Sequence, residues 1–204
     1  MGESRQANHC DTAQSRGFMQ AIEVLLQRYS GRVLQAPAPD EGALSVLIES
    51  ALTAPDHGKL RPWRFIVIQG EGRARLGNLL AEYTLRMRPT ATPEALERER
   101  QKALRAPMII VVAAITNPTA RIPVIEQILS AGAAAQNILL AAFALGFNAV
   151  WKTGDAAYDP AVKIALGLES KDAIVGFLYV GVEQPGSPPP VRPAATEFIR
   201  HWGV

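Results

Sequence analysis

Apolar residues recur every three to four positions in two early stretches of the chain, which is the spacing of one helix face. The first stretch covers residues 18–29. The second follows Asp40, a good N-cap residue, and must end before Pro55. A third stretch, residues 122–146, is largely apolar on every side. The pattern predicts two amphipathic helices and one long helix that needs neighbours on every side, and such a helix favours a dimer.

Short runs of β-branched and aromatic residues predict strands at four places, which are residues 65–68, 108–115, 149–151 and 174–182. Because the second run is apolar throughout, we expect a central strand that is buried on both faces. Gly70 and Gly72 end the first strand, and a helix is predicted after them to about residue 85. Another helix is predicted from Pro93, and a short one that Asp159 caps and Pro160 begins. Helices and strands in this order predict an α+β fold with a sheet of about four strands.

The composition fits one domain of ordinary size. Of 204 residues, 48% are hydrophobic and 20% charged, and the formal net charge is only +2. The sequence contains no block of basic residues, which would be expected of a nucleic-acid-binding protein. Residues 128–147 carry no charge over the length of a membrane span, but they are mostly Ala and Gly without a basic flank, so we expect a buried helix of a soluble protein rather than a membrane protein.

The chain divides into a polar start, a folded body and a proline-rich end. Residues 1–17 lack the apolar segment of a secretory signal, so we expect a flexible N-terminal tail. Residues 18–204 form the single domain, in which residues 183–204 are a proline-rich arm that lies over a surface, such as that of a second subunit. A lone cysteine, Cys10, excludes an internal disulfide and favours the cytoplasm.

Several common catalytic motifs are absent. A Gly-x-Gly follows the first predicted strand at Gly70, but Arg75 stands where a dinucleotide-binding loop needs glycine. No phosphate-binding loop or serine nucleophile elbow occurs, and three histidines far apart in the sequence predict no metal site. We therefore expect a bound cofactor, rather than a catalytic side chain, to supply the chemistry.

Three clusters carry candidate chemistry. Arg28-Tyr29-Ser30-Gly31-Arg32 offers two guanidinium groups and a hydroxyl, which suit a phosphate monoester, although two arginines at a helix end can equally remain solvated. The segment from Ala54 to Phe65 joins a helix to a strand and is dense in donors. The third cluster, Trp151-Lys152-Thr153-Gly154, follows a strand end, where ligands often bind, although a tryptophan there is commonly a core residue.

Taken together, the clusters resemble the nitroreductase family. The residues of their motifs are similar to those of its small YdjA-type branch. The resemblance rests on Arg28-Tyr29-Ser30, Ala54-Pro55-Asp56-His57, the segment 61–68 with its Pro-Trp pair, and the segment 174–181. It covers about residues 17–181. The resemblance implies an FMN-dependent homodimer with a small, mostly antiparallel mixed sheet, flanking helices and a long buried central helix.

The family's functional residues fall on eight positions of this chain. Arg28, Tyr29 and Ser30 would contact the FMN phosphate and ribityl chain, Thr53 and His57 would reach FMN from the partner subunit, and Trp151, Lys152 and Thr153 would line the flavin. Lys152 or Arg61 would supply positive charge beside the flavin, and the Thr153-Gly154 turn a backbone N–H. The implied reaction is ping-pong transfer of electrons from NADH or NADPH through FMN to a small oxidised acceptor such as a nitroaromatic compound or a quinone.

The chain departs from the family pattern in places. Tyr29 replaces a common second arginine, Leu60-Arg61 replaces a frequent Asn-Gln, and the usual basic residue of the tail has only Arg192 as a loose candidate. Alternatives that stay open are an FMN enzyme with another acceptor, such as a dehalogenase, an ene reductase or a flavin-destroying enzyme. A flavin-binding protein without turnover and a structural dimer without cofactor also remain.

Overall fold

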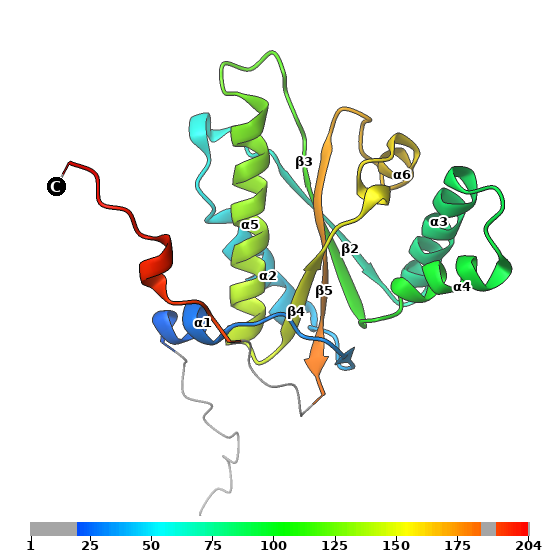
Figure 1. Cartoon of the computed structure of the whole chain (residues 1–204), viewed down its shortest axis with the longest axis horizontal. Coiled ribbons are helices and arrows are strands. Elements are labelled where there is room, and N and C mark those ends of the chain that lie inside the picture. The colour runs from blue at the N-terminus through cyan, green and yellow to red at the C-terminus, as the bar shows by residue number, and fades with distance from the viewer. Residues whose placement is uncertain (1–19, 185–190, 204) are drawn as a thin grey trace, which may run out of the picture.

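The structure, a computed structural model, describes residues 20–184 and 191–203. The tail expected over residues 1–17 and most prolines of the proline-rich arm therefore lie outside the described residues. Within these limits the chain forms an α+β fold in which helices cover both faces of one sheet (Figure 1).

The sheet has five strands, all paired antiparallel, in the order β1-β5-β3-β2, with β4 also paired to β5. The strands are β1 (Leu34–Gln35), β2 (Trp63–Gln69), β3 (Met108–Ala114), β4 (Asn148–Lys152) and β5 (Ala173–Glu183). One isolated parallel bridge, Ser30 to Ala149, lies beside the sheet and outside these strands. The sequence predicts only four strands because β1, with two residues, is too short for an alternating pattern.

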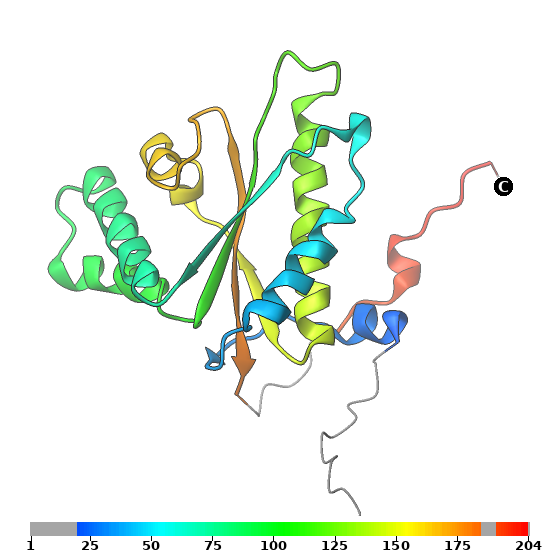
Figure 2. The same ribbon diagram turned by 180° about the vertical axis from the view of Figure 1, so that it is seen from behind.

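Strand β3 supplies both layers of the core. All seven of its residues are buried, as its unbroken apolar run predicts. Met108, Ile110 and Val112 pack into one hydrophobic cluster, whereas Ile109 and Val111 pack into the other. Side chains alternate across a strand, so one sheet serves two helical layers (Figures 1 and 2).

The first layer consists of α2 (Glu41–Leu52) and α5 (Val124–Ala144). Asp40 accepts a 2.8 Å hydrogen bond from the Ala43 N–H, as expected of an N-cap. Although α5 is long and apolar enough to span a membrane, eight of its residues are buried in this domain. Its face toward solvent still exposes Ile125 and Leu129, so a single chain does not cover the helix on every side.

The second layer consists of α3 (Glu71–Met87), α4 (Pro93–Lys102) and α6 (Pro160–Ala165). Pro93 and Pro160 occupy first helical positions, as predicted. Helix α3 begins at Glu71 and so includes Gly72, which was expected to precede the helix. A Cβ at Gly77 would lie 2.6 Å from the Arg100 carbonyl oxygen, so this glycine sets the close approach of α3 and α4.

The two ends of the described chain lie near each other. Helix α1 (Ala21–Gln27) is shorter than the helix predicted over residues 18–29, and residues 18 and 19 lie outside the described part. The final 3-10 turn, η3 (Ala195–Phe198), lies in the C-terminal segment that runs past α1 (Figure 1). This neighbourhood brings the end of α1 next to residues more than 160 positions later in the sequence.

Candidate functional site

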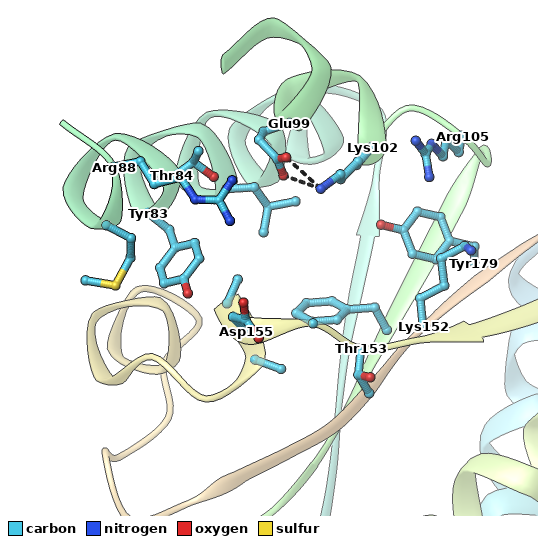
Figure 3. Close-up of a pocket in the computed structure, with 16 residues that line it drawn as sticks. Tyr83, Thr84, Arg88, Glu99, Lys102, Arg105, Lys152, Thr153, Asp155 and Tyr179 are labelled. Carbon is cyan, nitrogen blue, oxygen red and sulfur yellow. Dashed lines mark hydrogen bonds and ion pairs between the residues drawn. The ribbon is translucent and has the colours of Figure 1, made fainter. Parts of the chain in front are cut away.

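A cavity of about 480 Å³ opens between the second helical layer and the sheet. Its walls come from the end of α3, from α4 and the segment after it, from the end of β4 and from η2 (Asp155–Ala157). Aromatic and charged side chains share the lining, as Figure 3 shows. The residues that line the cavity include Tyr83, Arg88, Glu99, Lys102, Arg105, Lys152, Thr153, Gly154, Phe177 and Tyr179.

Two of the predicted flavin-lining residues, Lys152 and Thr153, lie on the cavity wall, together with Gly154. Lys152 pairs with Phe177 across the β4–β5 ladder, so both side chains project to the same face. Gly154 has φ 152° and ψ 172°, and a Cβ there would meet no atom within 4 Å. Because glycine alone readily adopts this conformation, the backbone itself forms the wall at the strand end.

Trp151, the third predicted flavin-lining residue, faces the other way. Its indole packs with the first hydrophobic cluster, and Nε1 donates a 3.1 Å hydrogen bond to the Val175 carbonyl. A Cβ at Gly176 would overlap the indole ring. Alternation along β4 explains the difference, because Trp151 and Lys152 are neighbours and must point to opposite faces. In this chain the Trp151 side chain is half-buried and packs against the core.

The Arg28–Ser30 segment lies beside the outer edge of β4. Ser30 forms its bridge with Ala149, and Gly31 N donates to the Ala149 carbonyl at 3.4 Å and to Asn148 Oδ1 at 3.1 Å. Lys152 follows Ala149 by three positions along β4, a rise of roughly 10 Å. The edge of β4 therefore links this segment to the cavity.

Arg28 lies close to a second cation. Arg192 donates a hydrogen bond to the Arg28 carbonyl oxygen. Burial first, and then the charge of Arg192, lower the pKa of the Arg28 guanidinium. No carboxylate of the described residues forms an ion pair with either arginine. The Arg192 guanidinium thus lies against the Arg28 backbone, and its positive charge acts on the Arg28 guanidinium.

Tyr29 is bound within the chain. Its ring meets Phe143 edge-on at 6.3 Å between centroids. A hydrogen bond with the Glu183 carboxylate, followed by burial, raises the pKa of the phenol. Glu183 also accepts 2.9 Å and 2.6 Å hydrogen bonds from Arg32 N and Asn148 Nδ2. Since its hydroxyl already has a partner, the Tyr29 side chain serves to hold the loop that carries Arg28 and Ser30.

Thr53 and His57 lie against α5, in the helical layer on the opposite face of the sheet from the cavity. Thr53 Oγ1 accepts a 3.1 Å hydrogen bond from Asn137 Nδ2 of α5. His57, in η1 (His57–Lys59), pairs with Glu126 of α5, with 2.6 Å between Nδ1 and Oε2. Both residues are exposed beside the uncovered face of α5. The fold thus separates them from Lys152 and Thr153 of the same chain.

An ion pair beside the cavity joins the end of α3 to the start of α6. Arg86, near the end of α3, donates to Asp159 at 2.6 Å and lies 5.8 Å from the Tyr83 ring centroid. Asp159 also caps α6 by accepting a 3.0 Å hydrogen bond from Val162 N. Burial alone would raise the pKa of Asp159, but the bond from Val162 N and the pairing with Arg86 outweigh it and lower the pKa.

Sequence reasoning missed most of the wall contributed by α3, α4 and β5. Tyr83, Arg88 and Arg105 lie in charged segments that read as solvated surface. The one sequence signal was Tyr179, a phenol inside an otherwise apolar strand. Arg61, considered as a cation beside the flavin, does not line the cavity of its own chain. Among residues 20–184 and 191–203, no cluster of acidic, histidine or cysteine side chains suits a metal ion.

Comparison of the sequence with known proteins identifies a matching family. The model of the "Nitroreductase family" matches residues 25–182. A curated Escherichia coli (strain K12) protein named "Putative NAD(P)H nitroreductase YdjA" is 35% identical over 185 residues, which cover 90% of this chain and 100% of that protein.

Solved structures agree with the sequence match. The nitroreductase-like family protein from Bacillus cereus superposes with a TM-score of 0.78 at 26% identity, covering 92% of this chain and 98% of that one. A Desulfovibrio desulfuricans protein solved in complex with FMN gives a TM-score of 0.69 at 26% identity, with 90% and 97% covered. The match over most of the chain in both sequence and fold shows that this protein belongs to the nitroreductase family.

Proposed function

We propose that the protein is an FMN-dependent NAD(P)H oxidoreductase that acts as a cytoplasmic homodimer and reduces a small oxidised acceptor, such as a nitroaromatic compound or a quinone. The observation that carries this proposal is the pairing of Arg28 with Arg192 at one end of β4, while Lys152, Thr153 and Gly154 line a cavity at its other end. FMN is extended, with a phosphate at one end of a ribityl chain and a planar ring at the other, and it suits both ends.

The phosphate end fits by charge. The Arg192 guanidinium contacts the Arg28 backbone, so both arginines bring positive charge to this end of β4, and exposed Ser30 adds a hydroxyl donor. A phosphate monoester carries nearly two negative charges, so two arginines match it without an acidic competitor. Arg192 thereby takes the part of the basic tail residue that the sequence alone left as a loose candidate.

The ring end fits by shape and charge. The cavity volume lies in the range typical of cofactor sites, and aromatic side chains form part of its wall. Lys152 brings positive charge to the wall, which stabilises negative charge on a reduced ring. The side-chain-free Gly154 lets a planar ring approach the backbone, so Thr153-Gly154 is the turn expected to donate an N–H to it.

A second subunit would complete the site. Thr53 and His57 cannot reach the cavity of their own chain, whereas their place beside the uncovered face of α5 suits a contact across a dimer interface. Ile125 and Leu129 are 59% and 63% exposed there, and Ile22, Leu25 and Leu26 of α1 are also exposed. Burying this apolar surface against a second copy supplies the driving force for dimerisation.

FMN, when bound, supplies the redox chemistry by accepting a hydride from the nicotinamide and passing two electrons to the acceptor. The chain's residues bind and orient. The arginine pair and Ser30 hold the phosphate, Lys152 adjusts the charge beside the ring, and the cavity admits donor and acceptor in turn. No side chain is needed as a nucleophile, which agrees with the absence of such a motif.

The first test is an absorbance spectrum of the purified protein before and after anaerobic addition of NADH or NADPH. Flavin bands that bleach on addition support the proposal and identify the donor. Bound flavin that neither nucleotide bleaches would instead support a flavin-binding protein without turnover. A colourless protein that takes up no FMN on soaking would refute the proposal.

A further inference from the structure

The cavity wall near the α4–β3 connection is rich in positive charge. Four basic residues line the cavity, Arg88, Lys102, Arg105 and Lys152, against the acidic Glu99 and Asp155. Glu99 neutralises Lys102 through a 2.7 Å contact between Nζ and Oε1, drawn as a dashed line in Figure 3. Within the described residues, no carboxylate forms an ion pair with Arg88, Arg105 or Lys152.

Arg105 stands in a short segment that is fixed at both sides. The flanking residues Ala103 and Ala106 are 0% and 1% exposed, and Arg73 Nη1 donates a 2.9 Å hydrogen bond to the Ala106 carbonyl. The close contact of Gly77 with the Arg100 backbone holds α4 against α3. The exposed Arg105 side chain therefore starts from a rigid backbone, which lowers the entropic cost of binding a ligand.

Aromatic surface adjoins this cation. The hydroxyl of Tyr179 points into the cavity in Figure 3, on the side where Lys102 and Arg105 lie. Burial raises the pKa of Tyr179, while the charge of Arg105 acts in the opposite direction, so the two groups are close enough to interact. A neutral phenol and a guanidinium together offer hydrogen-bond donors, and Phe177 and Tyr179 offer ring surface.

We propose that Arg105, assisted by the Tyr179 hydroxyl, selects an acceptor that carries a carboxylate on an aromatic ring. The inference rests on the proposed function, since it concerns what enters the cavity beside the flavin. A carboxylate fits better than a phosphate because Glu99 already neutralises Lys102, which leaves Arg105 as the exposed cation at this end. Arginine binds a carboxylate through two parallel hydrogen bonds.

A matched pair of substrates isolates the charge. The acceptors para-nitrobenzoate and para-nitrobenzamide have nearly the same shape, but only the first carries a negative charge. The first two-electron step converts the nitro group to nitroso, consumes one NAD(P)H and one proton, and releases one water. The ratio of the two kcat/KM values measures selection for the anion, and we expect it to favour para-nitrobenzoate by about tenfold or more.

Three variants connect that ratio to the structure. In Arg105→Met the ratio should fall about ten- to a hundredfold, because only para-nitrobenzoate loses a charge-assisted pair with Arg105. Arg98→Met removes an exposed arginine of α4 that does not line the cavity, and should change nothing. Glu99→Gln removes the partner of Lys102 and should raise the ratio a few-fold, about the size of a partly exposed charge effect.

Binding without turnover gives a second readout. Calorimetric titration of the FMN-loaded protein with benzoate and benzamide should show benzoate binding that Arg105→Met weakens and Arg98→Met does not. One outcome would overturn this inference but not the proposed function. In it the flavin bleaches normally, both nitro compounds react alike, and Arg105→Met leaves their ratio unchanged. The inference would also be overturned if Arg105→Met changed the preference for NADPH over NADH and left the acceptor ratio unchanged. The anion bound at Arg105 would then be the nucleotide phosphate. Failure of bleaching itself would refute the proposed function.

Discussion

The two faces of the sheet differ in how completely one chain covers them. On the α2–α5 face, small side chains let the helix lie directly on the strands, and polar groups such as Ser130 and Asn137 are satisfied by hydrogen bonds to Pro55 and Ser50 carbonyls. On the α3–α4–α6 face, large side chains such as Tyr83 stand around a cavity. The first face is closed inside and apolar outside, and the second is hollow and charged.

This difference assigns separate tasks to the two faces. An apolar outer surface such as that of α5 is suited to a second protein surface, whereas a charged cavity is suited to a small ligand. Thr53 and His57 lie on the first face, whereas Lys152 and Thr153 line the cavity on the second, so one chain does not bring the four residues together. Four predictions test this separation, from the largest expected effect to the smallest.

The largest effect is expected at the outer face of α5. In Leu129→Glu each subunit loses the burial of one leucine, about 1.5–3 kcal/mol, and a symmetric dimer loses it twice. The protein should become monomeric at micromolar concentration in size-exclusion chromatography with light scattering. Ile164→Glu is the matched control, since Ile164 is also 63% exposed but lies on α6. A Leu129→Glu variant that remains dimeric would remove this face from the interface.

The next effect concerns the core tryptophan. Trp151→Ala should lower the free energy of unfolding by about 3–5 kcal/mol in urea denaturation, because it leaves a void between α5 and β5 and an unpaired Val175 carbonyl. Trp202→Ala is the control, because Trp202 is 98% exposed. Equal stability of the two variants would contradict the core position of Trp151.

The proposed phosphate end, beside the edge of β4, comes third. Arg28→Ala should weaken FMN binding by about 1.5–3 kcal/mol, roughly ten- to a hundredfold, by removing a charge-assisted contact. Arg192→Ala should weaken it to a similar degree, and Arg75→Ala, an exposed change on α3, should not. Titration of the apoprotein with FMN measures all three, and unchanged affinity in Arg28→Ala would exclude Arg28 from the phosphate site.

The smallest effect is expected where α3 meets α6. The lowered pKa of Asp159 means that its ionised form stabilises the fold at pH values above the ordinary carboxyl pKa of 3.8, and that this contribution is lost as the pH falls through the lower native value. The free energy of unfolding should therefore fall less in Arg86→Met than in the unchanged protein as the pH is lowered. The difference should be less than about 1 kcal/mol, because the pair is partly exposed. Denaturation midpoints above and below pH 3.8 measure it, with Arg75→Met as control; identical pH profiles would show that the pair contributes nothing.

Local signals in the sequence determined most elements. Asp40, Pro93 and the Asp159-Pro160 pair predicted helix starts correctly, because capping depends on a few neighbouring residues. The apolar run of β3 predicted a fully buried strand, because burial on both faces leaves no place for a polar residue. The motif resemblance predicted the family, which the comparisons confirm.

Only the tertiary structure decided which residues meet. Arg192 lies beside Arg28, 164 positions away, and Arg105 and Tyr179 meet on one cavity wall through the order of strands in the sheet. Tyr29 and Trp151 have their side chains engaged inside the chain, although their motifs suggested ligand contacts. Sequence spacing carries local backbone preference, whereas these contacts depend on strand register and helix packing between segments far apart, which no short pattern encodes.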